Sequence, residues 1–209
     1  MISILTNDIK TKMASEPEEF EQIFKLNYQT FVSEIPQHTP NAKELLQDKF
    51  HSENIYFICL ENSAVIGMVA VRSNRPFSLD FKLPKLEQYL SVSERPIEIR
   101  LLAIRPDRRH GQILGLLIRA IWNYCLENNF SCALISGRVK NLPLYQKLGF
   151  KAFGPLVGTL IAPYQPMYLD KPSINKTLSI FKLNEEDNQV LNSASNFLPG
   201  PVSISKSVA

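Results

Sequence analysis

The residues with the clearest chemical potential form a basic turn that contains a glycine, Arg108-Arg109-His110-Gly111. Apolar residues recur at helical spacing from Ile113 to Tyr124, so the turn is predicted to lead into an amphipathic helix. The N–H groups at a helix N-terminus are unpaired and the helix dipole favours negative charge there, so this turn could bind phosphate. Two interpretations stay open: a pyrophosphate cradle, or a strand-to-helix connection whose arginines are only solvated.

The turn must be positioned by the elements on either side of it. Residues 96–104 form an apolar run that contains Glu98 and Arg100 and is closed by Pro106, which predicts a buried strand. Residues 131–137 form the next apolar run. Because a helix lies between the two runs, the second strand is expected to be a parallel neighbour of the first.

Two motifs, together with the strand EIRLLAIRP that precedes them, resemble the GNAT superfamily of N-acyltransferases. They are Arg108-x-x-Gly111 and Tyr145-x-x-x-Gly149-Phe150, and the resemblance covers residues 55–153 well and the N-terminal helix more loosely. It implies an α/β fold with a central mixed, twisted sheet flanked by helices. It also implies an enzyme that moves an acyl group from acetyl-CoA, or another acyl-CoA, to a small-molecule amine in a ternary complex.

The resemblance further implies roles for individual residues. An amine with a lysine-like pKa of about 10.4 is mostly protonated at neutral pH, so a base is needed, and Glu98 matches the family carboxylate. Tyr145 matches the tyrosine that protonates the departing thiolate. The structural alternatives are an ion pair of Glu98 with Arg100 and simple packing of Tyr145. The positions implied for donor binding are Leu102, Ala103, Ile104, Arg108, Arg109, His110, Gly111, Gln112 and Ile113.

The chain departs from the family pattern at Ile113, where the usual loop has Gly or Ala. A similar branch contains the acyl-homoserine-lactone synthases and N-acyl amino acid synthases, and the segment 28–34 resembles its first-helix signature. Members of that branch often take the acyl group from acyl carrier protein. Long-chain transfer from acyl carrier protein is therefore a second hypothesis. A catalytically silent GNAT-fold module, which binds a ligand or docks onto a partner enzyme, is the third.

The remaining patterns predict the supporting elements. Ser15 followed by Glu18 has the form of a capping box before a helical stripe that stops at Pro36. A short helix is expected within residues 42–50, in a stretch that could cover the acceptor. Gly67 indicates a bulge or a close backbone approach. The other expected elements are a hairpin of 55–61 and 64–72, a short helix over 144–148, and closing strands over 150–154 and 159–170, the last interrupted by Pro163 and Pro166.

The composition is that of a soluble globular chain with one core, since 44% of its 209 residues are hydrophobic. A net charge of +3 is too small to predict nucleic-acid binding. The three cysteines lie in apolar runs without metal-ligand spacing, which favours reduced, buried thiols in the cytoplasm and no metal site. Neither a signal peptide nor a membrane-spanning segment is expected, and a dimer is left open.

The character of the chain changes near residue 175. Residues 1–175 are predicted to form the acyltransferase domain, and 176–191 a linker or extension. The closing phrase FLPGPVSIS, within residues 192–209, resembles the opening of a class V aminotransferase. We therefore expect the native gene product to continue into such a domain, although nothing in residues 192–209 could hold pyridoxal phosphate.

Overall fold

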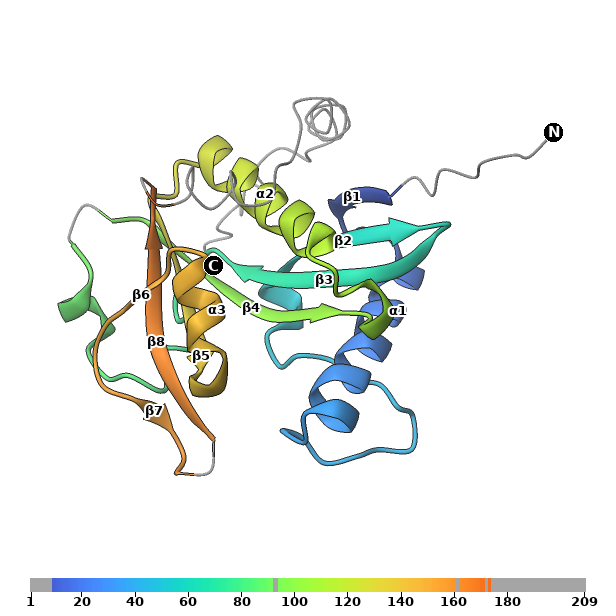
Figure 1. Cartoon of the computed structure of the whole chain (residues 1–209), viewed down its shortest axis with the longest axis horizontal. Helices are drawn as coiled ribbons and strands as arrows, with labels where there is room; N and C mark the ends of the chain where they lie inside the picture. The colour runs from blue at the N-terminus through green and yellow to red at the C-terminus, as the bar shows by residue number, and fades with distance from the viewer. Residues whose placement is uncertain (1–8, 92–93, 161, 172, 174–209) are drawn as a thin grey trace, which may run out of the picture.

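Eight strands form one sheet in the order β1-β2-β3-β4-β5-β8-β6, with β7 paired to β8 (Figure 1). The computed structural model describes residues 9–91, 94–160, 162–171 and 173. Every strand pairing is antiparallel except that of β4 with β5, so the predicted mixed α/β sheet is confirmed. The strands are β1 Ile9–Met13, β2 Ile55–Glu61, β3 Ala64–Arg72, β4 Pro96–Ile104, β5 Cys132–Arg138, β6 Lys151–Ala152, β7 Val157–Gly158 and β8 Pro163–Asp170.

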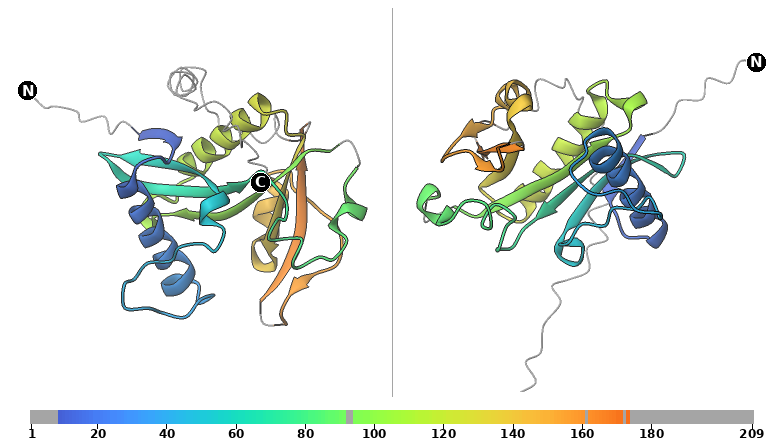
Figure 2. Two further views of the ribbon diagram at one scale, coloured as in Figure 1. Left: turned by 180° about the vertical axis from the view of Figure 1, so that it is seen from behind. Right: turned by 90° about the horizontal axis from the view of Figure 1, so that it is seen from below.

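Helices cover both faces of this sheet (Figures 1 and 2). On one face, α1 (Pro17–Tyr28) continues into a π-helical turn, Gln29–Glu34. On the other face, α2 (Gln112–Glu127) is followed later in the chain by the short α3 (Leu142–Lys147). Short 3-10 turns lie at His51–Glu53, Leu86–Tyr89, Pro106–Arg108 and Val139–Asn141. Among the described residues, no helix combines the length and the apolar character that crossing a membrane requires.

The core divides into clusters that follow these layers. Side chains of α2 pack on the sheet with residues such as Val69, Ile97 and Ile135. Side chains of α1 pack on the opposite face with Tyr56, Ile58 and others. A third cluster lies beneath the segment 77–86, where it covers β5. Successive residues of β4 and β5 therefore point alternately toward α2 and toward the α1 side, which decides which site residues share a face.

The predicted hairpin is confirmed with its expected bounds. Asn62 and Ser63 both have positive φ, 49° and 65°, as a two-residue type I′ connection requires. Gly67 in β3 confirms the predicted close approach: a Cβ there would lie 2.5 Å from Cγ2 of Ile113 on α2. Gly67 on β3 therefore makes room for the large side chain of Ile113 on α2.

Three local predictions were wrong: the start of α1, the helix within residues 42–50, and the interruption of the last strand by its prolines. The carboxylate that caps α1 is that of Glu19, which accepts from the backbone N–H groups of Ser15 and Glu16, so the helix starts one residue later than the Ser15–Glu18 pattern indicated. Pro17 suits this start because the first helical N–H has no partner anyway. Residues 42–50 form no helix. Asn41 and Asp48 side chains bind nearby backbone groups instead, which competes with helix formation.

Pro166 lies inside β8 rather than interrupting it, and Pro163 is the first residue of that strand. The carbonyl of Pro166 accepts from Phe153 N–H on the side of the short strand β6, so its missing N–H faces that side and not β5. Proline is tolerated at such an edge. The proposed linker and the aminotransferase-like segment 192–209 lie outside the described residues and stay predictions.

Candidate acyl-donor cleft and acceptor face

The central feature of the site is the divergence of β4 from β5 (Figure 1). These parallel strands pair only between residues 96–98 and 132–134. From Ile99 onward, the edge of β4 that faces β5 has no ladder partner in the part of the chain that the structure describes. Backbone N–H and C=O groups on this edge, other than the Ile104 carbonyl that accepts from Arg109, can therefore bind an extended ligand in the way that a sheet edge binds an added strand.

A β-bulge lies on β4 at this divergence. Met68 pairs with Ala103 and Ala70 with Arg100, so Leu101 and Leu102 together oppose the single residue Val69. Leu101 has a positive φ of 49°. The bulge turns Leu102 outward, 38% exposed, while Ala103 stays buried against α1.

A cleft of about 460 Å³ opens beside this bulge. It lies between the C-terminal part of the α1 segment, β4, the start of α2, and α3. The lining residues are mostly apolar: Thr30, Glu34, Ile35, Leu102, Ile104, Arg109, Gly111, Leu114, Leu144, Lys147 and Leu148. Four of the predicted donor-binding residues, Leu102, Ile104, Arg109 and Gly111, therefore meet at one cleft.

Gly111 is the N-cap of α2 and has a φ of +93°. A Cβ added to it would meet nothing within 4 Å, so the space above the helix start is open. The N–H groups of the first helical turn have no intrahelical acceptor, and they point into this space together with the positive end of the helix dipole. An anion would be stabilised here by backbone groups alone.

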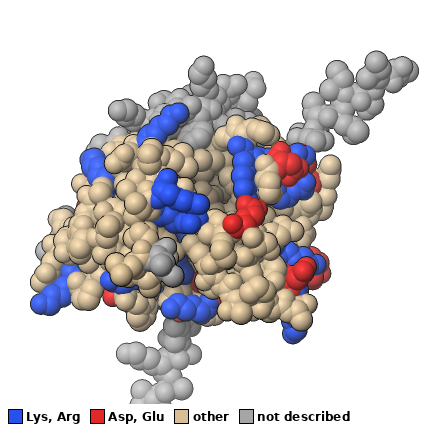
Figure 3. All heavy atoms as spheres, turned by 60° about the horizontal axis from the view of Figure 1, so that its bottom comes forward, with Lys and Arg blue, Asp and Glu red and all other residues tan. Residues whose placement is uncertain are grey.

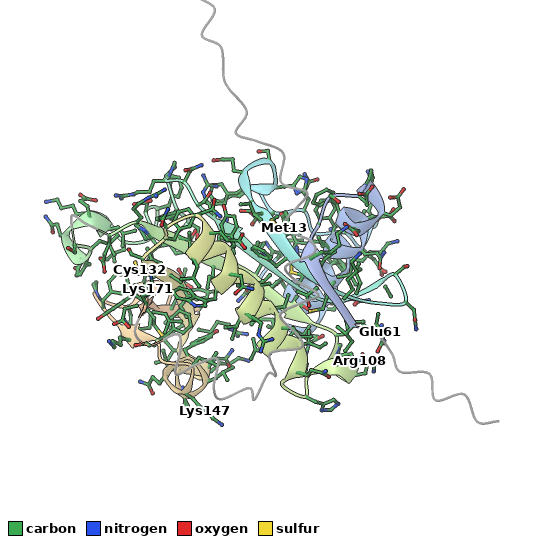
Figure 4. The ribbon with its side chains drawn as sticks, turned by 90° about the horizontal axis from the view of Figure 1, so that it is seen from above. Met13, Glu61, Arg108, Cys132, Lys147 and Lys171 are labelled. Carbon is green, nitrogen blue, oxygen red and sulfur yellow. The ribbon has the colours of Figure 1, made fainter. Side chains whose placement is uncertain are left out.

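The predicted cations of the turn already have protein partners. Arg108 donates to Glu61 at 2.6 Å, and this hydrogen bond raises the pKa of Arg108. Figure 4 shows the two side chains next to each other. Arg109 donates to the carbonyl of Ile104 and pairs with Glu34 at 2.8 Å. Figure 3 draws one face of the molecule, and on its right-hand part acidic side chains lie beside basic ones. His110 and Gln112 are exposed.

Ile113 does not face the cleft. Its side chain is 2% exposed and packs in the core between α2 and the sheet, against Gly67. The large side chain at this predicted donor-binding position therefore does not fill the cleft. The size of Ile113 gives no preference for acyl carrier protein over CoA.

Glu98 lies on β4 just before the divergence and is 1% exposed. One oxygen accepts from Ser78 N–H at 2.7 Å, and the other accepts from Ser78 Oγ at 2.6 Å and Leu79 N–H at 2.9 Å. Arg100 is at 3.7 Å from the carboxylate, so the ion pair foreseen as the alternative is present but long. The contacts made by Glu98 are those of an anchor for the segment 77–79, and its role as a base stays a prediction.

Tyr145 lies on α3, whose Leu144, Lys147 and Leu148 line the cleft. The Tyr145 ring itself packs against Gly137, where a Cβ would be 2.9 Å from the ring, and edge-on to Phe150. It is half-buried and is not among the lining residues of the cleft. Its role as the acid also stays a prediction.

The sequence patterns missed a cluster on the α1 side of the sheet. Arg100 pairs with Asp48 at 3.0 Å, and Arg72 pairs with Glu53 at 2.7 Å. Both guanidinium groups lie near the ring of Phe50: that of Arg72 is 4.1 Å and that of Arg100 is 4.6 Å from the ring centre. Because these partners are about 20 to 50 residues apart in sequence, no local spacing could have revealed them. No group of metal-ligating side chains occurs in the residues that the structure describes.

Residues 26–119 match a family model described as an acetyltransferase (GNAT) domain. This match covers a little under half of the chain and agrees with the GNAT resemblance that the sequence motifs carry. No curated protein sequence matches the chain.

Solved structures share this fold at low sequence identity. The CoA-dependent acyl-homoserine lactone synthase BjaI, with SAM and isopentyl-CoA, has a TM-score of 0.68 and 18% identity, covering 90% of this chain and 98% of its own. The N-acyl amino acid synthase FeeM from uncultured soil microbes has a TM-score of 0.67 and 14% identity, covering 85% and 98%. A putative N-acetyltransferase from Lactobacillus plantarum has a TM-score of 0.57 and 17% identity, covering 78% and 99%.

Proposed function

We propose that this protein transfers an acetyl or longer acyl group from an acyl-CoA thioester directly to a small-molecule amine. The single observation that carries the proposal is the cleft at which the unpaired edge of β4 meets the open N-terminus of α2. Two similar structures, a CoA-dependent acyl-homoserine lactone synthase with SAM and an N-acyl amino acid synthase, support a small acceptor.

The donor would bind along this cleft. Its diphosphate would accept from the free N–H groups that follow Gly111, and its pantetheine would pair with the open β4 edge at residues 102–104. The acceptor nitrogen then attacks the thioester carbonyl carbon and loses a proton. The oxyanion collapses, the C–S bond breaks, and the departing thiolate takes up a proton to give the free thiol and an amide.

We assign proton donation to the thiolate to Tyr145, because it lies on the helix that borders the cleft. Glu98 is 1% exposed and its carboxylate already accepts three hydrogen bonds from Ser78 and Leu79, so it is poorly placed to take a proton from an acceptor. We therefore assign Glu98 first to positioning the segment 77–79, and only second to base catalysis.

The second candidate is a long-chain acyltransferase that uses acyl carrier protein. Two observations favour it: the cleft is lined mainly by leucine and isoleucine side chains, and Arg108 is occupied by Glu61 and Asp107 instead of being free for a diphosphate. Thiol release from acetyl-CoA, a long-chain acyl-CoA and an acyl carrier protein, each measured with a panel of amines, separates the candidates. No release from any donor would refute both.

The donor site is tested by Gly111→Asp, with Gly111→Asn as the matched control. Both variants meet the same positive φ, which Asp and Asn tolerate better than other side chains. Only the Asp carboxylate occupies the helix N-terminus with negative charge. We expect calorimetry to show acyl-CoA binding roughly tenfold or more weaker in the Asp variant than in the Asn variant. Equal affinities would remove this turn from the donor site.

A further inference from the structure

A side chain of this protein already occupies part of the proposed donor edge. Arg109, from the turn before α2, donates from Nε to the carbonyl of Ile104 at 2.8 Å. That carbonyl shares a peptide unit with the N–H of Arg105, which donates to Ile66 on β3. Because the C=O and N–H of a trans peptide point in opposite directions, the Ile104 carbonyl faces away from β3. Arg109 therefore binds a carbonyl on the edge of β4 with which pantetheine would pair.

The same guanidinium also reaches the wall of the cleft that α1 provides. Its Nη2 lies 2.9 Å from Oε1 and 2.8 Å from Oε2 of Glu34. Glu34 is the last residue of the π-helical turn that continues α1. Glu34, Ile104 and Arg109 all line the cleft of about 460 Å³. One side chain therefore ties the α1 wall of the cleft to the edge of β4.

This connection competes with a donor for the same backbone group. An extended ligand that pairs with β4 needs the Ile104 carbonyl as an acceptor, and the guanidinium of Arg109 now donates to it. The side chains of Arg109 and Glu34 are 42% and 33% exposed. An ion pair at this exposure is weak and is screened by salt, so it can open without the unfolding of any element.

We propose that Arg109 and Glu34 form a latch that holds the donor cleft closed, so that a thioester pairs with β4 only in molecules whose latch is open. The inference rests on the proposed acyl transfer and adds a control on the entry of its donor. Opening the latch separates Arg109 from Glu34 and from the Ile104 carbonyl, which then accepts from the pantetheine. The apparent affinity for any donor is the intrinsic affinity multiplied by the open fraction.

The experiment measures thiol release by the full chain from one acyl group presented on two carriers, CoA and pantetheine. Pantetheine is uncharged and lacks the diphosphate. Glu34→Gln should raise kcat/KM for both thioesters by the same factor, about two- to fivefold, because it increases the open fraction that both donors need. Glu21→Gln is the matched control: it also removes a carboxylate from an ion pair on α1, with Lys25 at 2.6 Å, but does not line the cleft. Its kcat/KM values should stay within about 1.5-fold of wild type.

Two further measurements use the uncharged pantetheine thioester. Arg109→Gln removes both contacts of the latch, so it should raise kcat/KM at least as much as Glu34→Gln does. The double variant should gain no more than Arg109→Gln alone, because both changes open the same latch. Raising the salt concentration from about 0.05 to 0.5 M should increase kcat/KM of the wild type by screening the ion pair, and leave that of Glu34→Gln unchanged.

A gain in Glu34→Gln that is confined to acyl-CoA would mean that Glu34 only repels the diphosphate, and would overturn the latch while leaving acyl transfer intact. An unchanged or lower kcat/KM for both thioesters, in a variant with the Tm of wild type, would also overturn it. Absence of thiol release with every donor would refute the proposed function, and calorimetry with CoA and pantetheine then decides the latch separately. Glu34→Gln should bind both more tightly by the same factor, and equal or weaker binding than in wild type would contradict the inference.

Discussion

Replacing Glu98 with Gln tests how the segment 77–79 is held on the sheet. The buried carboxylate accepts three hydrogen bonds, two from backbone N–H groups and one from the Ser78 hydroxyl. The single amide oxygen of Gln can keep at most two of them, and its NH₂ group would face a remaining donor. One charge-assisted hydrogen bond contributes about 1.5–3 kcal/mol, and a buried unsatisfied donor costs about 1–3 kcal/mol. We expect a loss in free energy of unfolding of about 3 kcal/mol.

The assay is thermal unfolding supported by denaturant titration. For a domain of this size, about 3 kcal/mol corresponds to a decrease in Tm of roughly 6–12 °C. Glu87→Gln, in the following 3-10 turn, is the control: the Glu87 side chain is 61% exposed and pairs with Arg75 at 3.4 Å, so its loss should cost less than about 1 kcal/mol. A double variant with Ser78→Ala should lose less than the sum of the single variants, since both remove the same contact.

Kinetics separate anchoring from base catalysis. If Glu98 is an anchor, Glu98→Gln raises the KM of the acceptor, and the pH profile of kcat keeps its shape. If Glu98 is the base, kcat falls by about 10² to 10⁴ and the acidic limb of the profile disappears. A Tm within 1 °C of wild type would refute the structural reasoning, because it would mean that the three hydrogen bonds contribute nothing.

Three further predictions concern packing, proton donation and the thiols. Gly67→Ala should cost about 1–3 kcal/mol by overpacking Ile113, and Ile113→Ala in the same chain should recover part of it; strictly additive losses in denaturant titration would contradict the contact. Tyr145→Phe should lower turnover roughly ten to ten thousand fold with an unchanged Tm if the hydroxyl is the acid, whereas unchanged turnover would exclude that role. Burial raises the pKa of the thiols to about 11 in one case and about 12 in two, so iodoacetamide at pH 8 should label the native chain far more slowly than the unfolded one. The mass spectrum decides, and rapid native labelling of any of Cys59, Cys125 and Cys132 would show that the thiol is not buried.

Local chemistry explains why much of the fold was predictable from the sequence. The hairpin β2–β3 follows from alternating apolar residues and a two-residue turn, and β4 follows from an apolar run closed by Pro106. The start of α2 follows from Gly111, and the end of α3 from Gly149, whose φ of 85° is the left-handed conformation common just after a helix. In each case the determining residues are neighbours in sequence, so their pattern carries the information.

Only the tertiary structure decided what the charged side chains do. The partners of Arg108 and Arg109 are Glu61 and Glu34, 47 and 75 residues away. The role of Glu98 depends on a segment about 20 residues earlier that folds over β4. The pairing of Lys82 with Ser136 joins residues 54 apart. A charged residue has no period and no turn preference that names its partner, and many opposite charges compete for it. The choice among them is made by which segments the sheet brings together, and that depends on the packing of the whole core.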